Sequence, residues 1–130
     1  MPRLVVLDAL GLAYRAYYAF IGRPLRNSRG ENTSAIFGFS NMALRFRRDL
    51  APTSWALAWD GPGPTFRHEM YPEYKAHRPP MPEDLASQLT PIEELSQCLG
   101  LPVIEKPGME ADDVMATLAR LGAEIGRAHV

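Results

Sequence analysis

Three acidic side chains lie within four consecutive residues of the segment 108–113, at Glu110, Asp112 and Asp113. The apolar run 114–118 follows at once, so we expect a helix that starts near Met109 and carries Glu110 and Asp113 on one face. Crowded carboxylates repel one another and stay ionised together only beside a cation, and hard divalent ions such as Mg²⁺ take such oxygen ligands. The segment therefore indicates a metal site, with acidic capping of a helix N-terminus as the alternative.

Two further acidic residues follow predicted strands. Asp8 ends the apolar run Leu4–Leu7, and Asp60 follows Ser54–Trp59. A short apolar run without alternation predicts a strand buried on both faces, as in a parallel sheet, and ligands bind at the carboxyl ends of such strands. A lone Asp after a strand also suits a helix N-cap. The convergence of three acidic groups after three strands, the third being 101–105, favours the metal site.

Helices are predicted between these strands from the spacing of apolar residues. They cover Leu12–Phe20, Thr33–Leu50 with Thr33 or Ser34 as cap, and Pro82–Leu99 with a stop at Gly100. Within the last of these, the capping box Thr90–Glu93 predicts a kink or restart. The order β-α-α-β-loop-α-β-α predicts an α/β fold with a parallel sheet flanked by helices.

Basic and aromatic residues alternate in the stretch 66–82, a pattern that suits single-stranded nucleic acid because cations meet phosphates and rings stack on bases. A solvated amphipathic loop is the alternative. Another predicted exposed loop, 22–32, carries Arg23, Arg26 and Arg29.

Composition is that of one modest globular domain of 130 residues, 46% hydrophobic and 22% charged. The net charge of −1 excludes a uniformly basic nucleic-acid clamp. The single cysteine, Cys98, excludes an internal disulfide framework, indicates a reducing compartment and is expected in the core. Neither a signal peptide nor a membrane-spanning run is predicted.

The chain resembles the 5′→3′ nuclease domain at the N-terminus of bacterial DNA polymerase I, which is related to flap endonucleases. The resemblance rests on Leu7–Asp8, Leu12–Ala16, Trp59–Asp60, Thr65–Glu69, Tyr74–Leu85 and Gly108–Val114. It implies a PIN-like three-layer fold with a mainly parallel sheet, here its N-terminal portion, and hydrolysis of phosphodiesters in DNA. The family has glycine where this chain has Ala9.

The resemblance also implies the site residues and partners. Two Mg²⁺ or Mn²⁺ ions are expected on Asp8, Asp60, Glu110, Asp112 and Asp113. Lys75, Arg78 and Arg67 are the expected catalytic cations, and the expected DNA-binding residues are Tyr14, Arg15, Phe66, Arg67, Tyr74, Lys75 and Arg78. The stretch from about 64 to 82 resembles the helical arch that admits a free 5′ end or 5′ flap. A polymerase domain in the same parent chain, a monomeric state and a cytoplasmic, nucleoid-associated location in a bacterium are further expectations.

Residues 1–123 are expected to form the N-terminal part of this domain, because the family pattern continues with an Asp-x-Asp strand and a helix–hairpin–helix motif. Residues from Glu124 fit no helical continuation, and the last six can be encoded by one reading frame of a common sequencing adapter. We therefore expect 124–130 to be a non-native tail, an ordinary polar terminus being the alternative. The chain alone is expected to be inactive and marginally stable, with one sheet edge uncovered.

Two other functions compete with the nuclease. A non-catalytic DNA-binding module of the same fold is the first. The second is a phosphotransferase with Asp8 as nucleophile. That chemistry normally requires a second carboxylate two residues further on, and the chain has Leu10 at this position, which disfavours it.

Overall fold

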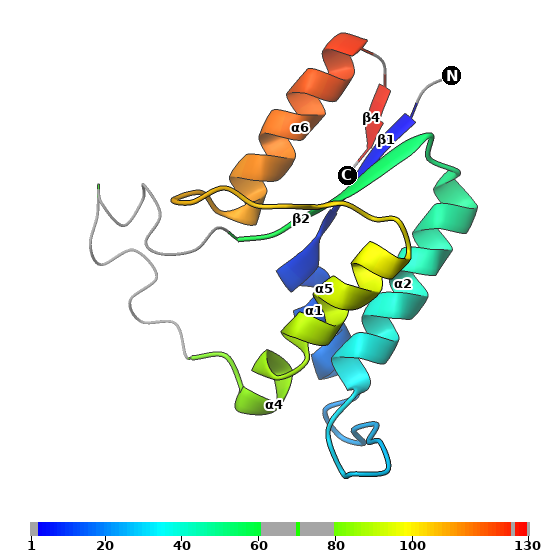
Figure 1. Ribbon diagram of the computed structural model, residues 1–130, viewed down its shortest axis with the longest axis vertical. Helices are drawn as coiled ribbons and strands as arrows, with labels where there is room; N and C mark the ends of the chain where they lie inside the picture. Colours follow the sequence, from blue (N-terminus) through cyan, green and yellow to red (C-terminus); the bar gives the residue numbers. More distant parts are fainter. Residues whose placement is uncertain (1–2, 61–69, 71–79, 126, 130) are drawn as a thin grey trace.

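The computed structural model describes residues 3–60, 70, 80–125 and 127–129. Four strands form one sheet in the order β3-β2-β1-β4, and every pairing is parallel (Figure 1). The strands are β1 (Arg3–Asp8), β2 (Ser54–Ala58), β3 (Val103–Ile104) and β4 (Arg127–His129). The predicted parallel sheet is confirmed.

Helices cover both faces of the sheet, which gives three layers (Figure 1). They are α1 (Ala9–Ala19), α2 (Ser34–Leu50), α4 (Glu83–Ala86), α5 (Leu89–Cys98) and α6 (Ala111–Ile125). Val5 and Leu7 of β1 pack in the core shared with α1, α2, α4 and α5, whereas Val6 packs against α6. The alternation of side chains along a strand thus explains why the whole run Leu4–Leu7 is apolar.

The helical pair α1–α2 packs closely because of one glycine. A Cβ built on Gly38 would lie 2.5 Å from the Cβ of Ala16, so only glycine admits this approach of the two helices. Phe20 and Phe37 meet edge to face at the end of the pair, with ring centroids 6.0 Å apart. The intervening loop exposes Arg23, Arg26 and Arg29, as predicted.

The predicted helix 82–99 is two helices. The chain turns at Ser87–Gln88 and α5 begins at Leu89, so the predicted restart is present and lies one residue before Thr90. The predicted stop at Gly100 is confirmed. Gly100 has φ +72°, and the amides of Gly100 and Leu101 bond back to the carbonyls of Gln97 and Ser96, which satisfies the helix end.

The start of α2 also differs from the prediction. Thr33 occupies the N-cap position, but its side chain makes no capping hydrogen bond. The first turn is capped instead by Gln88, whose Oε1 accepts from the amides of Ala35 and Ile36 at 2.9 and 3.1 Å.

One expectation about the C-terminal part is wrong, because helix α6 continues through Glu124 to Ile125. Strand β4 pairs with β1 over Arg3–Val5 only, so among the described residues the expected uncovered edge of the sheet is partly closed and stays open along β1 beyond Val5. Whether residues 124–130 are native stays a prediction.

Cys98 is exposed and not in the core. In the described part of the chain, no helix combines the length and apolar composition needed to cross a membrane.

Candidate metal centre

Asp8 joins β1 to α1 at the carboxyl end of the sheet. It is the N-cap of α1, and its Oδ1 accepts the amide of Gly11 at 3.2 Å, so the capping role is real. Burial raises the pKa of Asp8, the Gly11 hydrogen bond lowers it, and the charges of Asp112 and Asp60 raise it further. Asp8 therefore interacts electrostatically with acidic groups from two distant parts of the sequence at this edge of the sheet.

Gly11 provides the room for the Asp8 carboxylate. A Cβ on Gly11 would lie 2.5 Å from Oδ2 of Asp8, closer than any real Cβ contact. Ala9, where the family has glycine, is buried in the first turn of α1 and is not among the described residues with positive φ. The backbone after Asp8 thus has a conformation that alanine adopts freely.

Asp60 ties the end of β2 to the start of α6. Its Oδ1 accepts the amide of Ala111 at 2.7 Å, across 51 residues of sequence. A helix N-terminus stabilises a carboxylate because its free amides and the helix dipole are positive. This bond engages one carboxylate oxygen of Asp60, as the bond to Gly11 does for Asp8.

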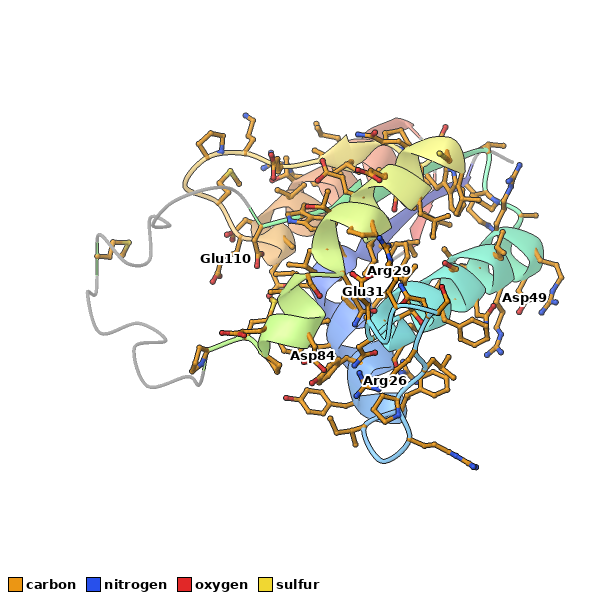
Figure 2. All side chains as sticks on the ribbon, turned by 60° about the horizontal axis from the view of Figure 1, so that its bottom comes forward. Arg26, Arg29, Glu31, Asp49, Asp84 and Glu110 are labelled. Atoms are coloured by element: carbon orange, nitrogen blue, oxygen red, sulfur yellow. The ribbon has the colours of Figure 1, made fainter. Side chains whose placement is uncertain are left out.

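The acidic segment divides into capping and outward-facing residues. Helix α6 begins at Ala111, two residues later than predicted, so Glu110 precedes it and does not share a helical face with Asp113. Oδ2 of Asp113 accepts the amide of Glu110 at 3.1 Å, so capping explains part of the role of Asp113. Glu110 is 8% exposed, whereas Asp112 is exposed. Figure 2 places Glu110 at the opposite end of the molecule from Asp49.

Every candidate ligand is a carboxylate, which is a ligand type that hard divalent ions bind. Burial and the acidic neighbours also disfavour the anionic form of Asp8. The geometry is not that of a closed site. Among the described residues, no three His, Cys, Asp or Glu side chains lie close enough together to hold one ion. The structure thus brings the predicted ligands to one edge of the sheet without assembling them around a common point.

A cavity of about 270 Å³ opens beside Asp8. It lies along β1 beyond Val5, where the pairing with β4 stops. Its lining residues are Val6, Leu7, Asp8, Gly11, Leu12, Arg15, Phe46 and Met115. Arg15 and Asp8 therefore line the same cavity. Tyr14 does not line it; this ring packs against the core and stacks on Tyr18 at 6.3 Å.

The remaining predicted site residues, Phe66, Arg67, Tyr74, Lys75 and Arg78, lie outside the described residues. The sequence prediction missed Gly11 and Phe46. A glycine in the first turn of a helix after an acidic N-cap is a signal that could have identified Gly11, whereas nothing local marks Phe46, which reaches the cavity from α2.

The comparison with protein families identifies the family of the chain. Residues 3–130 match the family described as 5′-3′ exonuclease, N-terminal resolvase-like domain. The chain belongs to this family. Among the family's curated proteins, DNA polymerase I of Pseudomonas aeruginosa is 44% identical over 124 residues, which cover 95% of this chain and 13% of that protein. DNA polymerase I of Deinococcus radiodurans is 46% identical over 118 residues, covering 91% and 12%. The chain thus spans about an eighth of the length of these relatives.

Solved structures of 5′ nucleases share the fold. A bacteriophage T5 protein co-crystallised with metal ions superposes with a TM-score of 0.72 at 19% identity, over 95% of this chain and 45% of that one. The T5 5′-exonuclease with bound zinc gives 0.70, and a T5 flap endonuclease in complex with DNA and metal ions gives 0.68 at 18% identity. The exonuclease-family chain therefore has the PIN-like 5′ nuclease fold that the resemblance implied.

Proposed function

We propose that this chain is the N-terminal part of a divalent-metal-dependent 5′→3′ DNA exonuclease and 5′-flap endonuclease that removes primers and flaps in replication and repair. One observation carries the proposal: Asp8 and Asp60 lie at the carboxyl ends of neighbouring parallel strands, and Asp60 accepts the amide of Ala111 beside Asp112, so carboxylates from three separate segments come to one edge of the sheet. Hydrogen bonds to helix amides account for one oxygen each of Asp8 and Asp60, but like charges placed near one another repel, and a bound cation would offset that repulsion.

Asp8, Asp60, Glu110, Asp112 and Asp113 would hold Mg²⁺ or Mn²⁺. When bound, a pair of such ions supplies a nucleophilic water and positive charge opposite the leaving oxygen. Asp8 and Asp60 each give one oxygen to a backbone amide, which fixes the carboxylate and leaves its second oxygen available as a ligand. Burial and the charges of Asp112 and Asp60 raise the pKa of Asp8, and a bound cation would favour its anionic form.

The DNA would reach this edge through the cavity beside Asp8. Arg15 is exposed at its wall and supplies a guanidinium for a phosphate. Tyr14, which packs against the core, is the neighbouring DNA-binding residue of this proposal. Arg67, Lys75 and Arg78 would bring charge to the reacting phosphate, while Phe66 and Tyr74 would stack on unpaired bases.

We further propose that this chain by itself does not cleave DNA at a useful rate. No three acidic side chains of its described residues converge on one ion position, and the chain spans only 13% of its polymerase I relative. A parent chain with a polymerase domain is supported by the names of these relatives. A monomeric protein in the bacterial cytoplasm, associated with the nucleoid, is part of the same proposal.

The test compares this chain with the full-length protein that carries it, on a 5′-flap substrate with Mn²⁺ or Mg²⁺. We expect metal-dependent cleavage by the full-length protein, its loss in Asp8→Asn, and DNA binding that survives the substitution. Comparable cleavage by the chain alone would refute the proposed inactivity. Metal-independent binding without any cleavage by the full-length protein would instead identify a non-catalytic DNA-binding module.

A further inference from the structure

Tyr18, near the end of α1, carries an exposed ring that two other rings hold in place. Its ring stacks on that of Tyr14 with the centroids 6.3 Å apart and the planes inclined by 12°. It also meets the ring of Tyr17 edge to face at 5.1 Å. Aromatic pairs prefer such offset-stacked and edge-to-face arrangements. Tyr18 is nevertheless 54% exposed, so an oriented ring is open to solvent.

The two rings that hold Tyr18 are themselves anchored. Tyr14 packs against the core, and Tyr17 is only 6% exposed. The hydroxyl of Tyr17 donates to Oδ1 of Asp84 at 2.8 Å, and Oδ2 of Asp84 accepts from Nδ2 of Asn32 at 2.9 Å. Exposed side chains ordinarily change rotamer freely, and a ligand must then pay for ordering them. The support of Tyr18 reduces that cost.

Tyr18 lies on the face of α1 that lines the cavity beside the metal centre. Gly11 and Arg15 line this cavity together with Asp8. At 100° per residue, Tyr18 is rotated by only about 20° from Gly11 and about 60° from Arg15 around the helix axis. Tyr18 therefore continues this face toward the C-terminal end of α1.

Arg15 supplies a positive charge beside the exposed ring. Its side chain is exposed, and within the described part of the chain neither ion pair involves it. A guanidinium that can bind a phosphate, next to a ring that can stack on a base, is the combination that single-stranded nucleic acid requires. A protein partner would instead favour a broad apolar patch, whereas Tyr18 is flanked on this helix by the exposed Arg15 and the small Ala19.

We propose that Tyr18 is a base-stacking residue for the unpaired strand of DNA, which extends the substrate site along α1 away from Asp8. The proposal rests on the proposed function and specifies which part of the substrate α1 contacts. Tyr18 is ten residues from Asp8, about 15 Å at 1.5 Å per residue. Stacked nucleotides rise about 3.4 Å each, so the contacted base lies about four nucleotides from the metal centre. Every base presents a π-face, so the contact tolerates any sequence.

The experiment uses the full-length protein that carries this chain and a 5′-flap DNA. The fluorescent base 2-aminopurine, whose emission falls on stacking, replaces each unpaired base near the duplex in turn, and EDTA prevents cleavage. Tyr18→Leu removes the ring, and Tyr18→Trp keeps an aromatic face at the same position. The control is Leu44→Ala, an apolar residue of α2 that is 48% exposed.

We expect reduced emission in the unsubstituted complex at a base about four nucleotides from the cleavage position. Tyr18→Leu should restore the emission there and weaken binding about fivefold or more, as the loss of a stacking ring does. With Mn²⁺ present, KM should rise by a similar factor while kcat stays within about twofold, because stacking on a distant base is equal in the ground and transition states. Tyr18→Trp and Leu44→Ala should bind as the unsubstituted protein does.

Two results would overturn the stacking role. Unchanged emission and affinity in Tyr18→Leu would exclude contact with a base, and cleavage by the unsubstituted protein would still support the proposed function. Equal losses in Tyr18→Leu and Tyr18→Trp would show that packing on Tyr14 matters and that stacking on DNA does not. Reduced emission that depends on Tyr18, without any cleavage by the unsubstituted protein, would support the stacking role and refute the nuclease function.

Discussion

Replacing Gly38 by alanine should loosen the α1–α2 pair. The new Cβ would lie 2.5 Å from the Cβ and 3.2 Å from the Cα of Ala16. Carbon atoms in ordinary contact are about 3.5–4.0 Å apart, so the two helices must separate by roughly 1 Å or more. The second contact is to backbone, so no side-chain rotation removes the clash.

The magnitude follows from two opposing effects. Overpacking of a well-packed core destabilises by about 1–3 kcal/mol. Alanine in place of glycine inside a helix recovers about 0.5–1 kcal/mol, because glycine loses more backbone entropy on folding. At the midpoints of these ranges the net loss for Gly38→Ala is about 1 kcal/mol, which lowers the melting temperature by roughly 3–6 °C in a chain of this size.

Thermal and urea unfolding of this chain, followed by circular dichroism, measure the effect. Gly22→Ala is the matched control, because nothing lies within 4 Å of a Cβ at that position. Adding Ala16→Gly to Gly38→Ala removes the 2.5 Å contact but keeps the 3.2 Å contact to the Cα of residue 16 and places a glycine inside α1, so it should restore only part of the stability. If Gly38→Ala is as stable as the unsubstituted chain, the close helix contact does not exist as described.

Three further predictions address single positions. Ala51 ends α2 with φ +43°, so Ala51→Gly should raise the free energy of unfolding by about 1 kcal/mol in urea denaturation, and a decrease would contradict the left-handed cap. The raised pKa of Asp8 means that the folded chain binds this proton more tightly than the unfolded chain does, so its contribution to stability falls as pH rises from the ordinary value of 3.8 through the folded pKa. Asp8→Asn keeps a capping oxygen for Gly11 and should raise the melting temperature at pH 7 and flatten its pH profile; a lower melting temperature at pH 7 would refute this. In the full-length protein, Lys75→Ala should reduce kcat for flap cleavage by at least about a hundredfold with little effect on duplex binding, whereas Arg45→Ala should change neither, and equal losses would contradict the role of Lys75.

The sheet and the acidic edge were predictable because their signals are local. Leu4–Leu7 and Ser54–Trp59 are apolar without alternation, and only a strand covered on both faces uses such a run. Each ends at an Asp, and parallel strands bring their carboxyl ends together. That step predicts that Asp8 and Asp60 lie near each other, and the charge of Asp60 is one of the causes that raise the pKa of Asp8.

Helix ends and side-chain exposure were less predictable because distant partners decide them. The break before α5 coincides with Gln88, which bonds to amides more than 50 residues away, and no local pattern encodes that. Cys98 was expected inside because leucines surround it. Ser96 is fully buried in α5, and a residue two positions further is rotated about 200° from it, toward solvent.

The network around Asp84 escaped prediction for the same reason. Its donors, Tyr17 and Asn32, come from 67 and 52 residues earlier in the chain. In the sequence, Asp84 looks like an ordinary acidic residue in the first turn of a helix. Only the folded arrangement distinguishes it from Glu83 beside it, which is exposed.

The register of β1 has a consequence for synthesis on the ribosome. Leu4 pairs with Ser54 on one side and Ala128 on the other, so both of these neighbours are synthesised well after β1. At about 5–20 residues per second, roughly 2.5–10 s separate β1 from β2, whereas α1 and α2 can form and pair in that interval. Nascent β1 therefore has unpaired edges beside the α1–α2 helical pair until β2 is synthesised. During translation, mispairing or chaperone binding is expected at Val5, Val6 and Leu7.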